Sequence, residues 1–370
     1  MLQVETFPLD DAALVLAPAS GAVAVVDAAT RAMLEELRLG RDATEIAAAR
    51  AAMAGVATAE ALGQVRALAD FWRRLSARRR ASPAPARPGA TGAPPALDLT
   101  IRLGPRPVRL RVWPPRLARV LAAVTAPGRG AGGAPADAGT AVLDVRRVGR
   151  SYELVLDGAP VLRTGDWMIA RSEVLRRLIL AGNPGREWLA VLHAAAVSGP
   201  AGAALLCGFS GAGKSTLTGY LLASGLELVT DDYAPIEAGS GLLWPVPFGL
   251  SVKEGSWPLL ASHFPELART PVVRTRQRRQ RYVAPPRATA TPQPVRCLVF
   301  PLYQPGAGME LTPLRPGEAL ALCAHSGGWY ESSPARLAEL VGWLGGRPAY
   351  ALAYDDTAAA VDAVRGLLAA

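Results

Sequence analysis

Lysine is almost absent from this chain of 370 residues. Of its 40 lysine and arginine residues, only Lys214 and Lys253 are lysines. Lysine carries a compact charge on a flexible stem, whereas the guanidinium group of arginine is broad and planar, so the two do not replace one another among phosphate oxygens. Two lysines in a chain so rich in arginine therefore point to two positions at which arginine would not serve.

Cysteine and long apolar runs are scarce as well. The three cysteines (Cys207, Cys297 and Cys323) belong to no pairing or metal-binding motif, which is typical of a reducing compartment. No charge-free apolar run is long enough to span a membrane, and the N-terminus lacks the charged-then-apolar plan of a secretion signal. We therefore expect a cytoplasmic protein without a membrane partner.

The charge balance favours an anionic partner. The formal net charge is +9, and a nucleotide, an acidic peptide or nucleic acid would each satisfy it. The densest basic stretch, residues 274–281, has five arginines in eight residues with only Tyr282 beside it. Because binding to single-stranded nucleic acid uses interleaved aromatic residues for stacking, we expect no nucleic-acid partner. We interpret residues 274–281 as a loop. It is either simply solvated, or mobile and close to the phosphates or to an acidic peptide.

The strongest motif is a glycine-rich loop between a predicted strand and a predicted helix. Residues 208–216 read Gly-Phe-Ser-Gly-Ala-Gly-Lys-Ser-Thr and fit the phosphate-binding pattern G-x-x-x-x-G-K-[ST]. The apolar run 202–207 is typical of a buried strand, and residues 215–223 have a helical pattern that ends before Gly225. Such a loop turns successive N–H groups toward a phosphate at the positive end of a helix.

The motif predicts a nucleotide-binding site with particular roles for its residues. Lys214 would reach the terminal phosphates, and the hydroxyl of Ser215 would hold Mg²⁺. A plain glycine turn is the structural alternative, but the required residue types stand here in the required order. The residues expected to bind the nucleotide are Gly208, Phe209, Ser210, Gly211, Ala212, Gly213, Lys214, Ser215 and Thr216, with the second lysine, Lys253, as a further candidate.

A pair of carboxylates follows the next predicted strand. Residues 226–230 read Leu-Glu-Leu-Val-Thr and end at Asp231 and Asp232. Carboxylates at a strand end beside the phosphates can hold a metal ion and accept a proton, although a polar strand end is the structural alternative. His193 lies upstream in a long apolar run, residues 188–197, which predicts a single strand. There it is either a core histidine or a part of the site.

The order of His193, the phosphate loop and the two aspartates resembles the catalytic domain of HPr kinase/phosphorylase and its relatives. The matching segments are Leu-His-Ala-Ala-Ala-Val at 192–197, the loop, Leu-Val-Thr-Asp-Asp at 228–232, and residues 247–255 and 297–301, so the resemblance covers about 98–368. It implies an ATP-dependent serine kinase that uses Mg²⁺, with a mixed-sheet fold akin to phosphoenolpyruvate carboxykinase. It also implies that Asp232 takes the proton from a substrate hydroxyl, that Asp231 lies near Mg²⁺, and that His193 supports the acid–base pair.

One departure limits that resemblance. The bifunctional enzymes carry a glutamate metal ligand in an Arg-Gly-Leu-Gly-type segment, whereas residues 244–249 here read Trp-Pro-Val-Pro-Phe-Gly. The resemblance therefore supplies no second metal ligand. Neither the reverse, dephosphorylating reaction nor HPr itself as the substrate carries over to this chain.

Residues 1–76 predict a separate small unit. Three β-like runs, at 4–9, 12–16 and 21–26, precede three helical segments, and Asp27 and Asp42 are placed to cap the first two. This order, and the run Val-Val-Asp-Ala-Ala-Thr-Arg-Ala-Met-Leu-Glu-Glu-Leu-Arg-Leu-Gly-Arg-Asp-Ala-Thr-Glu-Ile that begins at Val25, resembles the PqqD-like family of leader-peptide recognition modules. The resemblance implies that a leader peptide adds a strand beside residues 21–26 and packs on the third helix. The alternative is that the helical stripe is only the core of a small domain.

Together these features predict an α/β protein of two domains. A PqqD-like winged-helix α+β domain (1–76) and a Pro/Ala/Arg-rich linker (77–97) precede a mixed-sheet, HPr-kinase-like phosphate-loop domain (98–370). The predicted function is an ATP-dependent kinase that phosphorylates a Ser or Thr hydroxyl of a ribosomally made precursor peptide held by the first domain. The alternatives are a small-molecule kinase and a non-catalytic, nucleotide-gated peptide chaperone. The sequence leaves open the substrate, the phosphorylated residue, the phosphoryl donor and the oligomeric state, a homo-oligomer included.

Overall fold

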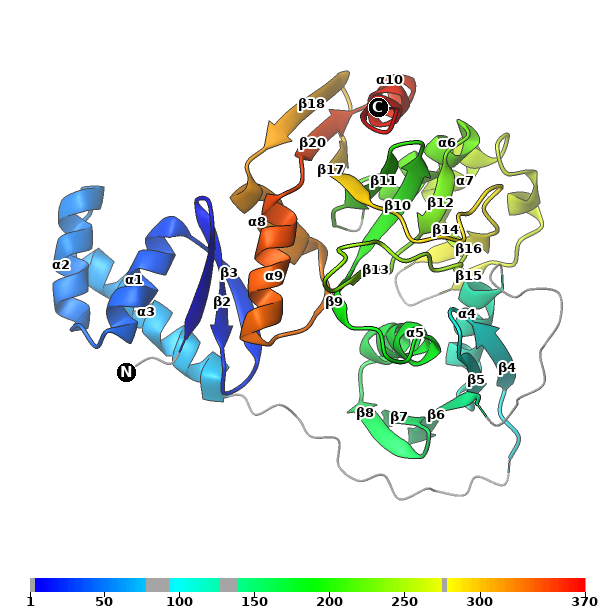
Figure 1. Ribbon diagram of the computed structural model, residues 1–370, viewed down its shortest axis with the longest axis horizontal. Coiled ribbons are helices and arrows are strands. Elements are labelled where there is room, and N and C mark those ends of the chain that lie inside the picture. The colour runs from blue at the N-terminus through cyan, green and yellow to red at the C-terminus, as the bar shows by residue number, and fades with distance from the viewer. Residues whose placement is uncertain (1–3, 78–92, 127–138, 210, 275–277, 370) are drawn as a thin grey trace.

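A computed structural model describes residues 4–77, 93–126, 139–209, 211–274 and 278–369 (Figure 1). Within these ranges the chain is a mixed α/β protein whose strands form both parallel and antiparallel pairs. The predicted α/β class is therefore confirmed. No helix in the described ranges is long and apolar enough to cross a membrane.

The first part of the chain is an antiparallel sheet followed by three helices. Their order is β1 (Glu5–Leu9), β2 (Ala12–Ala17), β3 (Ala22–Asp27), α1 (Ala28–Arg38), α2 (Ala43–Ala54) and α3 (Thr58–Ala77). The carboxylate of Asp27 accepts a hydrogen bond from the N–H of Thr30, and that of Asp42 accepts one from the N–H of Thr44. Both predicted N-caps are therefore formed, and the predicted βββααα order is confirmed.

The rest of the chain alternates strands and helices. Its strands are β4 (Leu97–Arg102), β5 (Pro107–Val112), β6 (Ala141–Val148), β7 (Ser151–Leu156), β8 (Ala159–Thr164), β9 (Trp188–Leu192), β10 (Ala194–Gly199), β11 (Gly202–Cys207), β12 (Glu227–Thr230), β13 (Ala234–Glu237), β14 (Leu250–Lys253), β15 (Val273–Arg274), β16 (Arg279–Val283), β17 (Val295–Tyr303), β18 (Met309–Leu314), β19 (Gly328–Tyr330) and β20 (Ala349–Tyr354). Its helices are α4 (Pro115–Thr125), α5 (Trp167–Gly182), α6 (Lys214–Ala223), α7 (Trp257–Leu260), α8 (Pro316–Ser326), α9 (Pro334–Gly345) and α10 (Thr357–Leu367), with short 3₁₀ turns at Glu254–Ser256 and Pro265–Ala268.

A six-stranded sheet, in the order β12-β10-β11-β17-β20-β18, carries the phosphate loop. Successive side chains of a strand point to opposite faces, so both faces of this apolar sheet must be covered. On one face Leu206 of β11 packs in one core with Leu217 of α6 and Val364 of α10. On the other face Leu205 packs in a core that includes Leu320 of α8. The loop therefore follows directly after a strand, β11, that is buried on both faces.

The N-terminal sheet forms a further layer on α8 and α9. Its central strand β2 is buried along its whole length. Val15 faces Trp72 of α3, whereas Leu16 shares the core that contains Leu320 of α8 and Leu337 of α9. In Figure 1, β2 and β3 lie between α8 and α9 on one side and α1 and α3 on the other. The sequence predicted a linker between two domains but not this apolar contact.

The run 188–197 is not one strand, so that prediction was wrong. β9 pairs with β13 and β19, whereas β10 belongs to the six-stranded sheet, and His193 stands at the corner between them. Both halves are buried and apolar, so the residue pattern does not reveal a change of sheet. The corner places the histidine half-buried at a strand end rather than inside a core.

Candidate active site

The phosphate loop joins the end of β11 to the start of α6, where the sequence predicted it. Gly208 and Gly213 have φ values of +144° and +94°, a region that side chains with a Cβ rarely enter. A Cβ at Gly213 would also come within 2.7 Å of the hydroxyl of Tyr354. Nζ of Lys214 donates a 2.5 Å hydrogen bond to the carbonyl oxygen of Gly208, so the ammonium group lies over the loop. Ser210 lies outside the described residues.

A cavity of about 230 Å³ lies beside this loop. It gathers side chains from segments that are far apart in the sequence, because the loop, the end of β12, the corner after β9 and the start of α5 meet there. The lining residues are Trp167, Met168, Arg171, His193, Lys214, Ser215, Asp232, Ser251, Lys253, Arg278 and Gln280. The structure thus places both lysines of the chain in one cavity with the predicted catalytic residues His193 and Asp232.

Asp232 and His193 form a pair on the wall of the cavity. Asp232 has a φ of +67°, in the left-handed region that aspartate tolerates better than most residues but that still stores strain. Nδ1 of His193 lies 3.1 Å from the backbone oxygen of Asp232 and 3.8 Å from Oδ1. Because a carbonyl oxygen only accepts, the proton of the neutral imidazole is on Nδ1, and Nε2 is left as an acceptor. The histidine therefore holds the turn that presents the carboxylate.

Asp231 has the opposite environment. It is only 3 % exposed, it does not line the cavity, and its Oδ2 accepts a 2.7 Å hydrogen bond from the N–H of Ser251. Burial, followed by the charge of Asp232, raises the pKa of Asp231 to about 7, although the Ser251 N–H, Lys214 and Lys253 act in the other direction. Asp232 faces the cavity and Asp231 lies behind it. Two neighbouring carboxylates in such different environments can take different roles in proton transfer.

This raised pKa predicts a pH dependence of stability. The folded state holds the Asp231 proton more tightly than the unfolded chain, so stability falls as the pH rises from the ordinary value of 3.8 to about 7. Replacing Asp231 with Asn should flatten the fall in melting temperature between pH 5 and 7, where one proton changes stability by at most about 1.4 kcal/mol per pH unit.

The control for this experiment is Asp98→Asn. A hydrogen bond from Arg109 lowers the pKa of Asp98, so its contribution to stability is already complete above its ordinary pKa and stays constant from pH 5 upward. Thermal unfolding of the three proteins across this range is the measurement. Parallel curves for the wild type and Asp231→Asn would show that Asp231 titrates normally.

The metal ligands predicted from the sequence are only partly assembled at the cavity surface. Ser215 lines the cavity and Asp231 lies behind it, while Asp232 is the carboxylate that faces inward. Among the described residues, no group of three or more His, Cys, Asp and Glu side chains forms a metal site. This donor set fits Mg²⁺, which proteins often hold through one or two side chains while phosphate oxygens and water complete the octahedron.

The cavity is rich in positive charge. Lys214, Lys253, Arg171 and Arg278 all line it. Burial, and then the charges of Arg278 and Lys214, lower the pKa of Lys253, as expected where cations are crowded together. A polyanion such as a triphosphate would relieve this repulsion. Thr216, the last residue of the motif, does not line the cavity, and its hydroxyl lies 2.6 Å from that of Ser256.

The arginine-rich stretch is more ordered than predicted. Arg279–Val283 forms β16, so the interpretation of residues 274–281 as a loop is wrong for this part. Arg279 pairs with Glu254, and the guanidinium group of Arg281 lies 4.2 Å from the ring centre of Trp257. Residues 275–277 lie outside the described residues, but Arg278 beside them lines the cavity. Part of this stretch therefore does lie beside the phosphate loop.

Sequence reasoning missed the contribution of α5. Trp167, Met168 and Arg171 reach the cavity from the first turns of this helix. Nη2 of Arg171 donates a 3.0 Å hydrogen bond to the hydroxyl of Tyr282 in β16, so the arginine is held across the cavity. No motif marks these residues, because only the packing of α5 beside β16 brings them to the phosphate loop.

A scan against protein-family models finds no match for this chain. A search of the curated proteins finds no relative either. What the structure itself shows is a mixed α/β protein in which the glycine-rich loop motif and the Asp232–His193 pair line one cavity.

Proposed function

We propose that this chain is an ATP-dependent kinase that phosphorylates a serine or threonine hydroxyl of a peptide. The observation that carries the proposal is the meeting of the phosphate loop, Asp232 and four cationic side chains in one cavity. A loop of this type binds phosphates, and a carboxylate beside it can activate a hydroxyl. The resemblance to HPr kinase-related proteins supports the same interpretation.

In the proposed phosphoryl transfer each residue of the cavity has a separate role. The substrate oxygen attacks the terminal phosphorus, the bond to the departing diphosphate breaks, and Asp232 accepts the hydroxyl proton. Lys214, Lys253 and Arg278 are placed to neutralise charge on the transferring group and the leaving oxygen. Mg²⁺, held by Ser215 and phosphate oxygens, would supply further charge neutralisation. His193 positions Asp232 through the backbone oxygen of that residue.

The N-terminal sheet offers an edge on which a peptide can form a strand. Among the described residues, no strand pairs with the outer edge of β3. The N–H of Ala28 donates to the oxygen of Asp11, and antiparallel pairs alternate, so the backbone groups of Val23 and Val25 point to this open edge. An added strand would gain main-chain hydrogen bonds there. The apolar contact of β2 with α8 and α9 would keep a captured peptide near the kinase domain.

Blocking this edge tests peptide capture. Val25→Pro removes an outward N–H and adds a ring at the edge, but it leaves the β2–β3 ladder intact. We expect KM for a precursor peptide to rise roughly tenfold, about 1.4 kcal/mol, with little change in kcat. Val25→Ala is the matched control, since it also shortens the side chain but keeps the N–H. Deleting residues 1–76 is less informative, because it would uncover the apolar faces of α8 and α9.

The direct test uses peptides encoded in short reading frames beside the gene. Each is incubated with the protein, ATP and Mg²⁺, and phosphorylated residues are located by mass spectrometry, with Lys214→Ala as the inactive control. A phosphorylated serine or threonine that depends on Lys214 supports the proposal. Tight binding of peptide and nucleotide without transfer would replace the kinase with a nucleotide-gated chaperone.

A further inference from the structure

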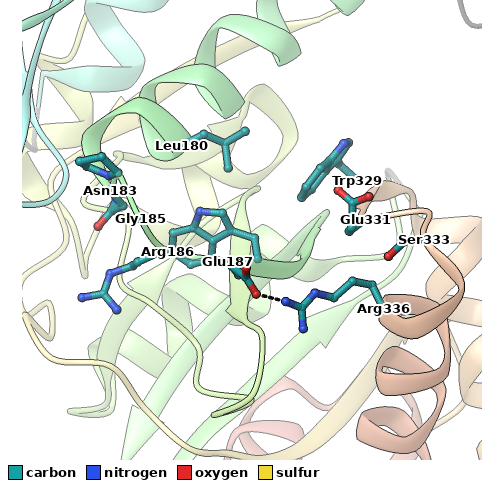
Figure 2. Close-up of a pocket in the computed structure, with 11 residues that line it drawn as sticks. Leu180, Asn183, Gly185, Arg186, Glu187, Trp329, Glu331, Ser333 and Arg336 are labelled. Atoms are coloured by element: carbon teal, nitrogen blue, oxygen red, sulfur yellow. Dashed lines mark hydrogen bonds and ion pairs between the residues drawn. The ribbon is translucent and has the colours of Figure 1, made fainter.

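A second cavity, of about 420 Å³, lies at the end of α5 remote from the phosphate loop (Figure 2). It is lined by Leu180, Asn183, Pro184, Gly185, Arg186, Glu187, Trp188, Trp329, Glu331, Ser333 and Arg336. These residues come from the last turns of α5, the loop 183–187 that follows it, the start of β9, β19 with the segment after it, and the start of α9. None of them lines the catalytic cavity, so this is a separate site.

A third cavity links this site to the N-terminal sheet. It has a volume of about 260 Å³ and shares Glu331 and Ser333 with the second cavity. The rest of its lining includes Gly21 and other residues of the turn between β2 and β3. The two cavities therefore adjoin at the segment 331–333, and together their linings extend from Gly21, just before β3, to Leu180 of α5.

The second cavity, taken with the carboxylates that pair with its two arginines, has an excess of negative charge in a basic protein. Arg186 pairs with Glu237 at 2.5 Å, and Arg336 pairs with both Glu187 and Glu339. Each arginine is thus already neutralised. The carboxylate of Glu331 has no hydrogen-bond or ion-pair partner in the part of the chain that the structure describes. The two arginines therefore stand against four glutamates, of which Glu331 is the one without a partner, and this balance favours a cationic ligand.

Aromatic side chains stand beside this free carboxylate. Figure 2 shows Trp329 next to Glu331, with Ser333 on the same side of the cavity. The guanidinium group of Arg176 lies 5.0 Å from the ring centre of Trp329, so a cation is already accommodated at this ring. An indole and a carboxylate at one place bind a guanidinium or ammonium group through cation–π and charge-assisted contacts.

Helix α5 connects the second cavity to the catalytic one. Leu180 lines the former and Arg171 the latter. Nine residues of helix span about 14 Å, which an extended peptide covers with roughly four residues. A peptide that leaves the edge of β3 at Gly21 therefore meets the third cavity, then the second, and then the phosphate loop.

We propose that the second and third cavities bind the stretch of substrate peptide between the segment paired with β3 and the phosphorylated residue, and that the second cavity takes a basic side chain of that stretch. Glu331 binds its cationic group, and Trp329 covers its stem. The identity of the peptide as a kinase substrate rests on the proposed function. The preference of the second cavity for a basic side chain does not depend on it.

The test measures binding to the full chain rather than activity. The probe is the pentapeptide Gly-Gly-Arg-Gly-Gly, blocked at both ends, and its counterpart with citrulline, which has the same shape without the charge. Binding is followed by the indole N–H resonances of the tryptophan-labelled protein, and the Trp329 signal is assigned with Trp329→Phe. We expect a saturable shift of the Trp329 signal with the arginine peptide, and about fivefold weaker binding of the citrulline peptide.

Glu331→Gln should weaken binding of the arginine peptide by a similar factor, about fivefold. Glu227→Gln, which removes one exposed carboxylate of β12 outside both cavities, should leave it unchanged. No shift of the Trp329 signal, or equal binding of the two peptides by the wild type, overturns the proposal without any reliance on a variant. Phosphorylation of a precursor peptide would still stand in that case, so the two proposals fail separately.

Discussion

Replacing Asp232 with asparagine is expected to slow phosphoryl transfer by roughly 10²–10⁴-fold while nucleotide binding is retained. Asparagine has nearly the same shape and keeps an acceptor oxygen, but it cannot take the proton of the attacking hydroxyl. It also tolerates the left-handed backbone at this position, where φ is +67°. His193 contacts the backbone oxygen of residue 232, so the turn should persist. The loss of one negative charge beside the phosphates should leave nucleotide affinity equal or slightly higher.

The control for this variant lies one residue away. Asp231 is buried behind the cavity, so Asp231→Asn should leave the proton acceptor in place. If Asp231 also helps to hold Mg²⁺, as the sequence predicts, the variant should need more Mg²⁺. Transfer rates and nucleotide affinities are measured for both variants over a Mg²⁺ titration. If Asp232→Asn transfers at the wild-type rate, another group accepts the proton and the proposed role of Asp232 is wrong.

The second large effect is expected at Lys214. Lys214→Ala removes the ammonium group that lies over the phosphate loop, so both nucleotide binding and transfer should be lost. Lys214→Arg should fail as well, because the residue is only 9 % exposed and a planar guanidinium group does not fit where Nζ contacts the oxygen of Gly208. Nucleotide affinity by calorimetry and the transfer rate together are the measurement.

Lys253 provides the matched comparison in the same cavity. It lies beside Arg278 and Lys214, so its replacement by arginine keeps the total charge of the cavity. We expect Lys253→Arg to retain more nucleotide affinity than Lys214→Arg, because only Lys214 belongs to the phosphate loop itself. Near-normal transfer by Lys214→Ala would contradict the role given to the loop.

The sequence predicted the parts of the site that depend on local chemistry. A phosphate loop needs a fixed order of glycine, lysine and hydroxyl residues within one strand–turn–helix unit, so its motif can be recognised without the fold. The caps at Asp27 and Asp42 are equally local, since each side chain bonds an N–H two or three residues away. The strand, turn and helix around the motif and the two caps are confirmed, because no distant contact decides them.

The sequence did not predict the parts that depend on packing between distant segments. Arg171 reaches the site only because α5 lies beside β16, and the corner at His193 arises where two apolar strands enter different sheets. Helix α4 was missed as well, although Leu117 and Leu121 are fully buried on it. The contact between the N-terminal sheet and α8 likewise joins apolar residues more than 300 positions apart, which no motif marks.

Single-turnover transfer from labelled ATP to a precursor peptide, with nucleotide binding followed in parallel, tests the kinase proposal most directly. Enzyme is held in excess over ATP, so that one transfer event is observed and product release does not limit the rate. The account predicts rapid transfer to a serine or threonine by the wild type, transfer slowed by roughly 10²–10⁴-fold in Asp232→Asn, and equal nucleotide binding by both. Transfer of equal rate in the two proteins, or binding of both ligands by the wild type without any transfer, would contradict it.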